Sequence, residues 1–271
     1  MIVNSLHNEK INEGYDAKMY NPLVQELFEG TDFYNFGYWY SETKSQNEAC
    51  ENLIEQLLDL IPVKGGKILD VACGKGATTC FLTKYYDPRN IIGINLSDKQ
   101  LESSRMNAPG CRFIKMDATR LTFNNQSFNA VVAVEAAFHF KTRETFIREA
   151  YRVLVSGGHL VLSDILFKKW AELTSPGLVA ENHLETPADY RALLERIGFD
   201  EIVIQNVTTQ TLRGFIRHML RFLGNKLYTG QVNPLMYGFL SSNILRRWMP
   251  AFSSYLIACA HKPVKERKGR R

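Results

Sequence analysis

The sequence predicts an α/β fold in which helices cover a mostly parallel β-sheet. Short apolar stretches alternate with helical patterns from residue 67 onward, as a parallel sheet with crossover helices requires. A loop of small residues, 72–77, joins the first apolar stretch to a helical one. The chain has 271 residues, of which 45% are hydrophobic and 23% charged, as in an ordinary globular protein. This length suits one large domain with an insertion.

Residues 1–61 precede the alternating region, and we expect them to form an N-terminal helical cap. The aromatic cluster at 33–39 is too dense to remain in water and must pack on another part of the chain. Apolar residues then recur at helical spacing over 48–60. Pro62 and the following Gly65-Gly66 are expected to end this helix.

Residues 62–167 are expected to form a cofactor-binding core. Its strands are predicted at 67–71, 90–95, 112–115, 130–135 and 159–165. Its helices are predicted at 78–85, 98–106 and 143–154. Ser97 is placed to cap the second of these helices, and Gly157-Gly158 to stop the third and turn the chain.

The alternation loosens after residue 167, and residues 168–250 are expected to hold lid helices, one core strand and a helical insertion. Residues 168–182 form the expected lid segment, and Thr186-Pro187 begins a helix with a cap residue and a proline. A strand is predicted at 201–207, followed by the insertion at 212–250. The last core strand lies within 251–261, and 262–271 form a basic tail.

Arginines recur every fourth residue at Arg213, Arg217 and Arg221 in the insertion. Such a stripe occurs on helices that lie on a membrane surface. More often it belongs to an amphipathic helix packed on its own domain, which is what we expect, with peripheral membrane contact as the alternative. A second, aromatic-rich helix starts at Asn233-Pro234, and we expect the two helices to roof a hydrophobic substrate pocket.

The net charge of +5 resides in the last ten residues, which carry six Lys/Arg and one Glu; the other 261 residues balance to zero. A basic groove for nucleic acid is therefore not expected. The five cysteines have no Cys-x-x-Cys spacing, and no metal-ligand pattern is evident. Neither a leader sequence nor a long apolar run is recognisable. We expect a cytoplasmic monomer or homodimer without stable membrane insertion.

The most specific motif is KILDVACGKGATT at residues 67–79. Small residues allow a ligand to approach the backbone, and the helix that follows offers free N–H groups. A dinucleotide site needs a third glycine, but Thr79 follows Gly74 and Gly76 here. Asp70 adds a carboxylate, which suits a ligand with an ammonium and a sulfonium better than a pyrophosphate. A glycine-rich turn without a ligand is the alternative.

This stretch resembles motif I of class I S-adenosylmethionine (SAM)-dependent methyltransferases, with Ala72 and Ala77 in place of two glycines. The resemblance covers roughly residues 67–261, because a late pair of strands follows five alternating units. It implies a Rossmann-like, seven-stranded, mostly parallel sheet with helices on both faces, the N-terminal cap and a C-terminal helical lid. It also implies SAM as cofactor, with Asp70, Ala72 and Gly74 in its cradle.

The resemblance assigns further cofactor contacts at the ends of the next two strands. Asn95 stands where the family usually has an acid that binds both ribose hydroxyls, and Leu96 and Gln100 belong to the same site. Asn95 can still bond a diol, but without charge assistance. Asp117 would accept a hydrogen bond from the adenine amino group, and the Ala118 N–H would face the ring.

Candidate catalytic residues follow the fourth and fifth strands, at the edge where ligands bind an open parallel sheet. His139 suits the removal of a proton from a hydroxyl near pH 7, with Asp164 or Glu135 stabilising the imidazolium. A satisfied core histidine is the alternative. His139 and Asp164 resemble the His and Asp pair of small-molecule O-methyltransferases of the rebeccamycin-sugar and erythromycin type. Glu135 is also expected to contact the cofactor.

The N-terminal aromatic residues are similar to those of the same enzymes and of mycolic-acid cyclopropane synthases. The resemblance places Tyr15 of the Tyr15-Asp16 pair, together with Tyr34, over the methionine part of the cofactor. The synthases carry Glu-His-Phe where this chain has Phe138-His139-Phe140, which argues against alkene chemistry.

The sequence therefore predicts a SAM-dependent methyltransferase that acts on a hydroxyl of a hydrophobic, natural-product-like small molecule. C-methylation of a quinone-, sterol- or prenyl-type carbon is the second hypothesis. A non-catalytic SAM-binding protein is the third.

Overall fold

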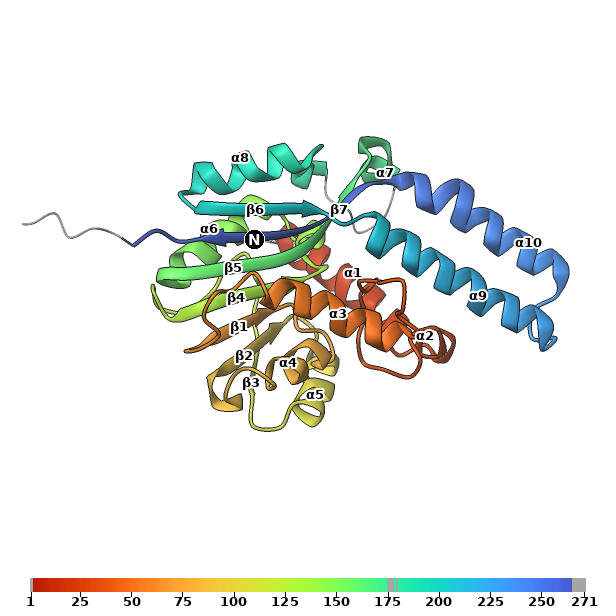
Figure 1. Ribbon diagram of the computed structural model, residues 1–271, viewed down its shortest axis with the longest axis horizontal. Helices are drawn as coiled ribbons and strands as arrows, with labels where there is room; N and C mark the ends of the chain where they lie inside the picture. The colour runs from red at the N-terminus through yellow and green to blue at the C-terminus, as the bar shows by residue number, and fades with distance from the viewer. Residues whose placement is uncertain (1, 175–177, 179, 265–271) are drawn as a thin grey trace, which may run out of the picture.

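The computed structural model describes residues 2–174, 178 and 180–264, and its centre is a seven-stranded sheet (Figure 1). The strand order is β3-β2-β1-β4-β5-β7-β6, and β7 runs antiparallel to both of its neighbours. The strands are β1 (Ile68–Val71), β2 (Ile91–Asn95), β3 (Arg112–Lys115), β4 (Phe128–Val134), β5 (Leu154–Phe167), β6 (Asp200–Asn206) and β7 (Phe252–His261). The predicted α/β fold with a mostly parallel seven-stranded sheet is confirmed.

Helices lie where the sequence pattern predicts them. They are α1 (Ile2–Met19), α2 (Pro22–Leu27), α3 (Gln46–Leu58), α4 (Ala77–Leu82), α5 (Asp98–Asn107), α6 (Arg143–Val153), α7 (Lys169–Thr174), α8 (Pro187–Ile197), α9 (Gly214–Tyr228) and α10 (Pro234–Asn243). The Ser97 hydroxyl accepts the Gln100 N–H at 3.2 Å and caps α5, as predicted. Thr186 forms a capping box with Asp189 at the start of α8.

Side chains alternate between the two faces of the sheet and build two apolar cores. In β1, Ile68 packs with α3 and α4 on one face, while Leu69 and Val71 pack with α6 and α8 on the other. All four β1 residues are buried, including Asp70. Because β1 is the middle one of the five parallel strands, the loop that follows it lies at the centre of their carboxyl edge.

The glycines at 157 and 158 do not stop α6, so that prediction is wrong. The helix ends at Val153 and β5 begins at the next residue. Gly157, with a φ of +82°, and Gly158 lie within β5, where the pairing with β4 shifts register. A Cβ on Gly158 would lie 2.9 Å from the Asn129 carbonyl oxygen, so the irregularity requires the small residue.

The insertion forms a helical hairpin, α9 and α10, that projects away from the sheet (Figure 1). Its base is anchored by Phe215 and Ile216, which are buried, and Phe215 stacks on Phe36 with ring centroids 4.7 Å apart. The predicted aromatic cluster at 33–39 therefore packs on the base of this hairpin. Arg213, Arg217 and Arg221 are exposed.

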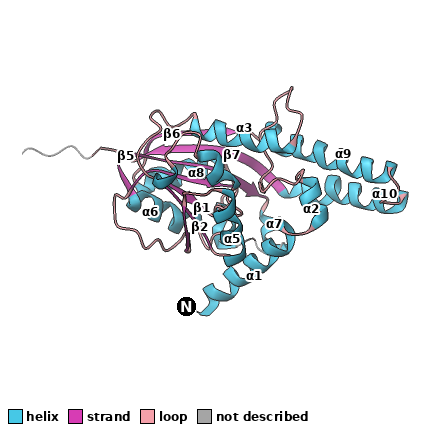
Figure 2. Cartoon of the chain, turned by 90° about the horizontal axis from the view of Figure 1, so that it is seen from below, coloured by secondary structure: helices cyan, strands magenta, loops and turns pink. Residues whose placement is uncertain are grey.

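The N-terminal helix α1 lies beyond the strand ends, on the side of α5 (Figure 2). The Tyr20 hydroxyl bonds Ser103 Oγ at 2.7 Å and donates to the Lys99 carbonyl at 2.9 Å. Helix α1 thus lies over the carboxyl edge of the sheet. Residues 175–177 and 179 of the expected lid and 265–271 of the expected basic tail are outside the described residues. No helix within the described ranges is long and apolar enough to cross a bilayer.

Candidate active site

The loop after β1 has the backbone conformation of a ligand cradle. Ala72 and Gly74 have φ values of +58° and +56°, in the left-handed region that glycine tolerates best. The Ser104 hydroxyl donates to the Gly74 carbonyl at 2.9 Å and holds the loop against α5. Gly76 starts α4, and a Cβ there would lie 2.7 Å from Ser104 Cα. The glycine at 76 therefore allows α4 and α5 to pack closely, and the one at 74 faces the cavity.

A cavity lies at the carboxyl edge of the sheet, between the loops after β1 to β4 and the inner side of α1. It brings together most of the residues predicted from the sequence, which are Tyr15, Tyr34, Ala72, Gly74, Asn95, Leu96, Gln100, Asp117, Ala118, Glu135 and His139. Sequence analysis missed Ile11, Asn12, Met19, Met116 and Lys141, which also line it. Residues 11, 12, 15 and 19 share one face of α1, so helical spacing from Tyr15 could have pointed to Ile11, Asn12 and Met19.

Asp70 lies beneath the cradle and not in the main cavity. Its carboxylate is buried and accepts a hydrogen bond from the Thr79 hydroxyl at 2.6 Å. It lines a smaller adjoining cavity that shares Ala72 and Gly74 with the first. Burial raises the pKa of Asp70 to about 7. A nearby cation would therefore favour its ionised form.

The expected position of Asp164 is corrected by the structure. Strand β5 continues to Phe167, so Asp164 lies inside the sheet, fully buried, and does not line the cavity. Its carboxylate accepts hydrogen bonds from Arg143 Nε at 2.7 Å and from the Ile165 N–H at 2.8 Å. Asp164 is thus half of a buried ion pair with Arg143, which we did not foresee because the two residues are 21 positions apart.

Glu135 connects the cap to the end of β4. Its backbone has a φ of +48°, and its N–H donates to the Ser163 carbonyl at 3.0 Å. Its Oε1 accepts hydrogen bonds from the Phe36 N–H and the Tyr255 hydroxyl, both at 2.6 Å. Burial, the largest cause, and the nearby Asp164 raise the pKa of Glu135 to about 8. The side chain is therefore held firmly and is mostly protonated at pH 7.

His139 ends a short 3₁₀ turn (Ala137–His139) after β4 and contacts α1. Its Nε2 is hydrogen-bonded to the Tyr15 hydroxyl, and the two rings meet edge to face with centroids 5.0 Å apart. Tyr15 also packs edge to face on Tyr34, which stacks on Phe28. Burial raises the pKa of Tyr15 well above its ordinary value, so its hydroxyl remains protonated. Tyr15 and Tyr34, which the resemblance places over the cofactor, are thus packed together, and Tyr15 contacts the candidate base His139.

A chain of side-chain amides and a carboxylate lies at the end of β2. Asn95 Nδ2 donates to Gln100 Oε1 at 2.7 Å, and Gln100 Nε2 donates to Asp16 Oδ1 at 2.6 Å. The Ser97 hydroxyl also donates to Asp16, at 2.8 Å. Asp16 comes from α1, and sequence analysis gave it no role. A carboxylate of the cap therefore contacts the side-chain pair at the end of β2.

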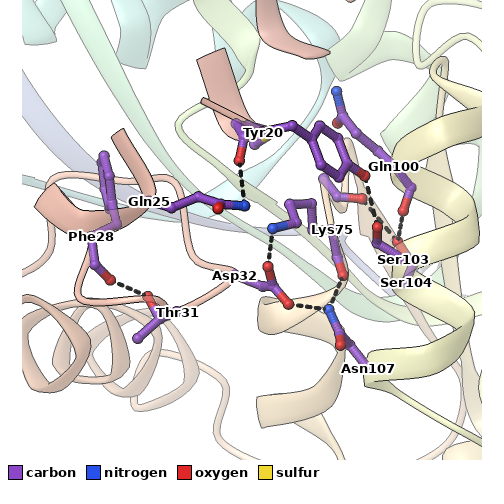
Figure 3. Close-up of polar contacts among 12 residues, drawn as sticks. Tyr20, Gln25, Phe28, Thr31, Asp32, Lys75, Gln100, Ser103, Ser104 and Asn107 are labelled. Atoms are coloured by element: carbon purple, nitrogen blue, oxygen red, sulfur yellow. Dashed lines mark hydrogen bonds and ion pairs between the residues drawn. The ribbon is translucent and has the colours of Figure 1, made fainter. Parts of the chain in front are cut away.

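Figure 3 shows a second set of contacts that joins the cap to the cradle. Lys75, inside the glycine loop, is ion-paired with Asp32 of the cap and is largely buried. Asn107 Nδ2 donates to the same carboxylate and, at 2.9 Å, to the Lys75 carbonyl. The cap is thus fastened to the loops that follow both the first and the second strand.

The loop after β3 is also held in place locally. Asp117 Oδ1 accepts hydrogen bonds from the Thr119 N–H and hydroxyl, each at 2.8 Å. Such a turn orients the carboxylate and presents the adjacent backbone of Ala118. Met116 donates its N–H to the Asn95 carbonyl at 3.0 Å, which keeps the β2 and β3 loops together.

These residues fit the chemistry of S-adenosylmethionine. A Cβ added to Gly74 would meet only Met19 Cε, at 3.4 Å, so the cradle is open where a side chain would intrude. Amides at 95 and 100 suit a ribose diol, and Asp117 suits an exocyclic amine. The aromatic faces of Tyr15 and Tyr34 suit a sulfonium. The fold and site together define an enzyme that binds a cationic nucleoside cofactor.

Comparison with known proteins agrees with this class. The methyltransferase domain family matches residues 69–162. Methyltransferase GfsG of Streptomyces halstedii is 30% identical over 75% of this chain and 77% of its own length. Erythromycin 3''-O-methyltransferase of Saccharopolyspora erythraea is 26% identical over 85% of this chain and 84% of its own. The chain belongs to the class I SAM-dependent methyltransferases that act on small molecules, and its cofactor is S-adenosylmethionine.

Solved structures share the fold across almost the whole chain. The [4+2]-cyclase SpnF has a TM-score of 0.73 and 23% identity, covering 95% of this chain and 97% of its own. Geranyl diphosphate C-methyltransferase from Streptomyces coelicolor has a TM-score of 0.67 and 15% identity, covering 94% and 97%. Because a cyclase and a C-methyltransferase share this architecture, the fold does not specify the acceptor.

Proposed function

We propose that this methyltransferase methylates a hydroxyl group of an apolar small molecule, with His139 as the general base. The hydrogen bond between the Tyr15 hydroxyl and His139 Nε2 carries the proposal. This contact supports the proposal because it brings Nε2 against a hydroxyl group at the wall of the cofactor cavity. An acceptor hydroxyl needs the same partner in order to lose its proton.

SAM supplies an electrophilic methyl group on a sulfonium when it is bound. In the proposal, Gly74 and Ala72 cradle its amino-acid part, Asn95, Leu96 and Gln100 its ribose, and Asp117 and Ala118 its base. Tyr15 and Tyr34 cover the sulfonium side of the cavity. Their rings also exclude water, which would otherwise compete with the acceptor for the catalytic base.

The proton is removed by His139. With its proton on Nδ1, the imidazole presents a lone pair on Nε2, and Tyr15, whose phenol stays protonated, donates to it. An incoming hydroxyl replaces Tyr15 at Nε2 and gives up its proton there. Glu135, protonated below about pH 8, offers the acceptor a hydrogen-bond partner from the same wall.

Two further observations support an apolar alcohol or phenol as acceptor. Met116, Val134 and Phe140 add apolar surface to the cavity wall. Among relatives, erythromycin 3''-O-methyltransferase and 27-O-demethylrifamycin SV methyltransferase of Amycolatopsis mediterranei carry names that specify O-methylation; the second is 29% identical over 79% of this chain.

The test compares His139→Ala with His159→Gln, a control in the amino-terminal half of β5. Lipophilic phenols, sugars and prenyl compounds are screened as acceptors by mass spectrometry. We expect O-methyl products and a fall in turnover of about 10²-fold or more for His139→Ala, with SAM affinity retained. The His159→Gln control should keep both its turnover and its SAM affinity. An unaltered rate would remove His139 as base, and a methyl group on carbon would favour the C-methyltransferase hypothesis.

A further inference from the structure

The tip of the α9–α10 hairpin exposes large apolar side chains. Tyr228 is 92% exposed, Leu235 86%, Phe239 68% and Met236 51%. Helix α10 has no buried residue. Apolar side chains gathered on a projecting element are unfavourable in water and mark a surface that contacts something else.

Basic side chains without acidic partners lie along the hairpin, from its base to the middle of α9. Residues 202–265 contain no Asp or Glu. Five arginines of the hairpin and its last turn are exposed, and among the described residues none of them forms an ion pair; they are Arg213, Arg217, Arg221, Arg246 and Arg247. Lys226, by contrast, is buried and paired with Glu26 of α2. The hairpin therefore presents five uncompensated positive charges between its base and the middle of α9, while its tip is apolar.

An apolar cavity of about 440 Å³ lies between the hairpin and helices α2 and α7. Its walls come from α2, α7, α9 and α10, and include Leu23 and Trp170, which are 55% and 48% exposed. Exposed lysines, Lys168 and Lys169, precede Trp170. An aromatic ring beside lysines and arginines is typical of side chains at a membrane–water interface.

We propose that the α9–α10 hairpin docks on an anionic lipid bilayer, with its apolar tip in the interface and Arg217 and Arg221 of α9 on the phosphates. Guanidinium groups bind phosphate oxygens well, and exposed basic residues near an anionic leaflet each add to binding. A second copy of this chain is a poorer partner, because five arginines would meet five arginines. A nucleic acid would satisfy the arginines but leave Leu235 and Phe239 in water.

The hairpin is suited to this contact because it projects from the sheet (Figure 1). Docking through its tip leaves the cofactor cavity, which the hairpin does not line, unchanged. The inference therefore stands whether or not the acceptor is an alcohol.

The test is flotation of the full-length protein with vesicles of phosphatidylcholine alone or mixed with phosphatidylserine. We expect about tenfold or stronger binding to the anionic vesicles, weakened at high salt. Two variants should each lose about tenfold or more of that binding. One carries Leu235→Ser with Phe239→Ser, and the other Arg217→Gln with Arg221→Gln.

Matched controls change equally exposed residues elsewhere. Val63→Ser with Met106→Ser removes apolar side chains that are 80% and 71% exposed, and Arg105→Gln removes an exposed arginine of α5. These controls should bind vesicles like the parent, and all variants should keep their SAM affinity.

Several results would overturn the proposal. Absence of vesicle binding, or equal binding to both lipid mixtures, would exclude an anionic bilayer as partner. Undiminished binding by both hairpin variants would move the contact to another part of the chain, such as the basic tail. A dimer in analytical ultracentrifugation that the tip variant converts to monomer would assign the surface to a second copy.

Discussion

Asp16 of the cap accepts a hydrogen bond from Gln100 at the end of β2, with 2.6 Å between Nε2 and Oδ1. Gln100 in turn accepts one from Asn95. The family usually has an acid at the end of the second strand. In this chain Asn95 stands there, paired with Gln100, and Asp16 of α1 holds Gln100. In the proposed ribose site, cofactor binding would therefore depend on the position of α1.

Replacing Asp16 should therefore weaken cofactor binding although Asp16 does not line the cavity. Asp16→Ala removes a charge-assisted hydrogen bond, frees Gln100 and loosens α1, so we expect SAM affinity to fall about tenfold. Glu13→Ala, an exposed change on the same helix, is the matched control. Calorimetric titration with SAM measures both. Equal affinity for the Asp16 variant and the parent would mean that α1 does not support the ribose site.

An acid at position 95, as in the family, should support SAM binding only when Asp16 is replaced by a neutral residue. Asn95→Asp alone places a second carboxylate on Gln100, which has one amide to share, so we expect weaker SAM binding than in the parent. Combining it with Asp16→Asn should recover affinity, with a coupling of about 1 kcal/mol or more between the two sites. A double-mutant cycle of SAM affinities tests this. Strictly additive effects would contradict the shared role of Gln100.

The buried carboxyl of Asp70 should make the stability of the cofactor-free protein fall as pH rises. Its pKa rises from 3.8 to about 7 on folding, so between these values the native state binds more protons than the unfolded state. The free energy of unfolding then decreases with pH across this window, by at most about 1.4 kcal/mol per pH unit. Glu135 adds a similar slope up to about pH 8.

Asp70→Asn should flatten the Asp70 slope while keeping an acceptor for Thr79. Urea unfolding at several pH values measures it, and Asp98→Asn, at an exposed carboxylate, is the control. If Asp70→Asn leaves the slope between pH 4 and 7 as it is in the parent, the carboxyl is ionised in the folded state.

We expect the Arg143–Asp164 ion pair to stabilise the fold without affecting the titration of His139, the proposed base. Asp164→Asn leaves Arg143 buried with no full counter-charge, so we expect the free energy of unfolding to fall by about 3–5 kcal/mol. In the folded variant, the acidic limb of the kcat–pH profile, which reports the proposed base, should match that of the parent. The Glu135 titration should move to lower pH, because Asp164 contributes to its raised pKa. A shift of the acidic limb would restore Asp164 to a role at His139.

Local sequence was sufficient for the elements of the fold. Strands β1 to β3 and helices α5, α6 and α8 agree with apolar periodicity and with the caps at Ser97 and Thr186, because such signals act between neighbouring residues. The cradle was recognisable for the same reason, since the left-handed backbone at Ala72 and Gly74 requires small residues within one short loop.

The tertiary structure decided which polar groups meet. Asp164 and Arg143 are joined because β5 extends past the predicted strand end and α6 begins opposite it. Asp16 reaches Gln100, 84 positions away, only because α1 docks over the sheet edge. Periodicity indicates which face of an element is apolar, but the partner of a charged side chain depends on how distant segments pack. The sequence alone therefore determined the fold class and the cofactor, while packing determined the partners of its carboxylates.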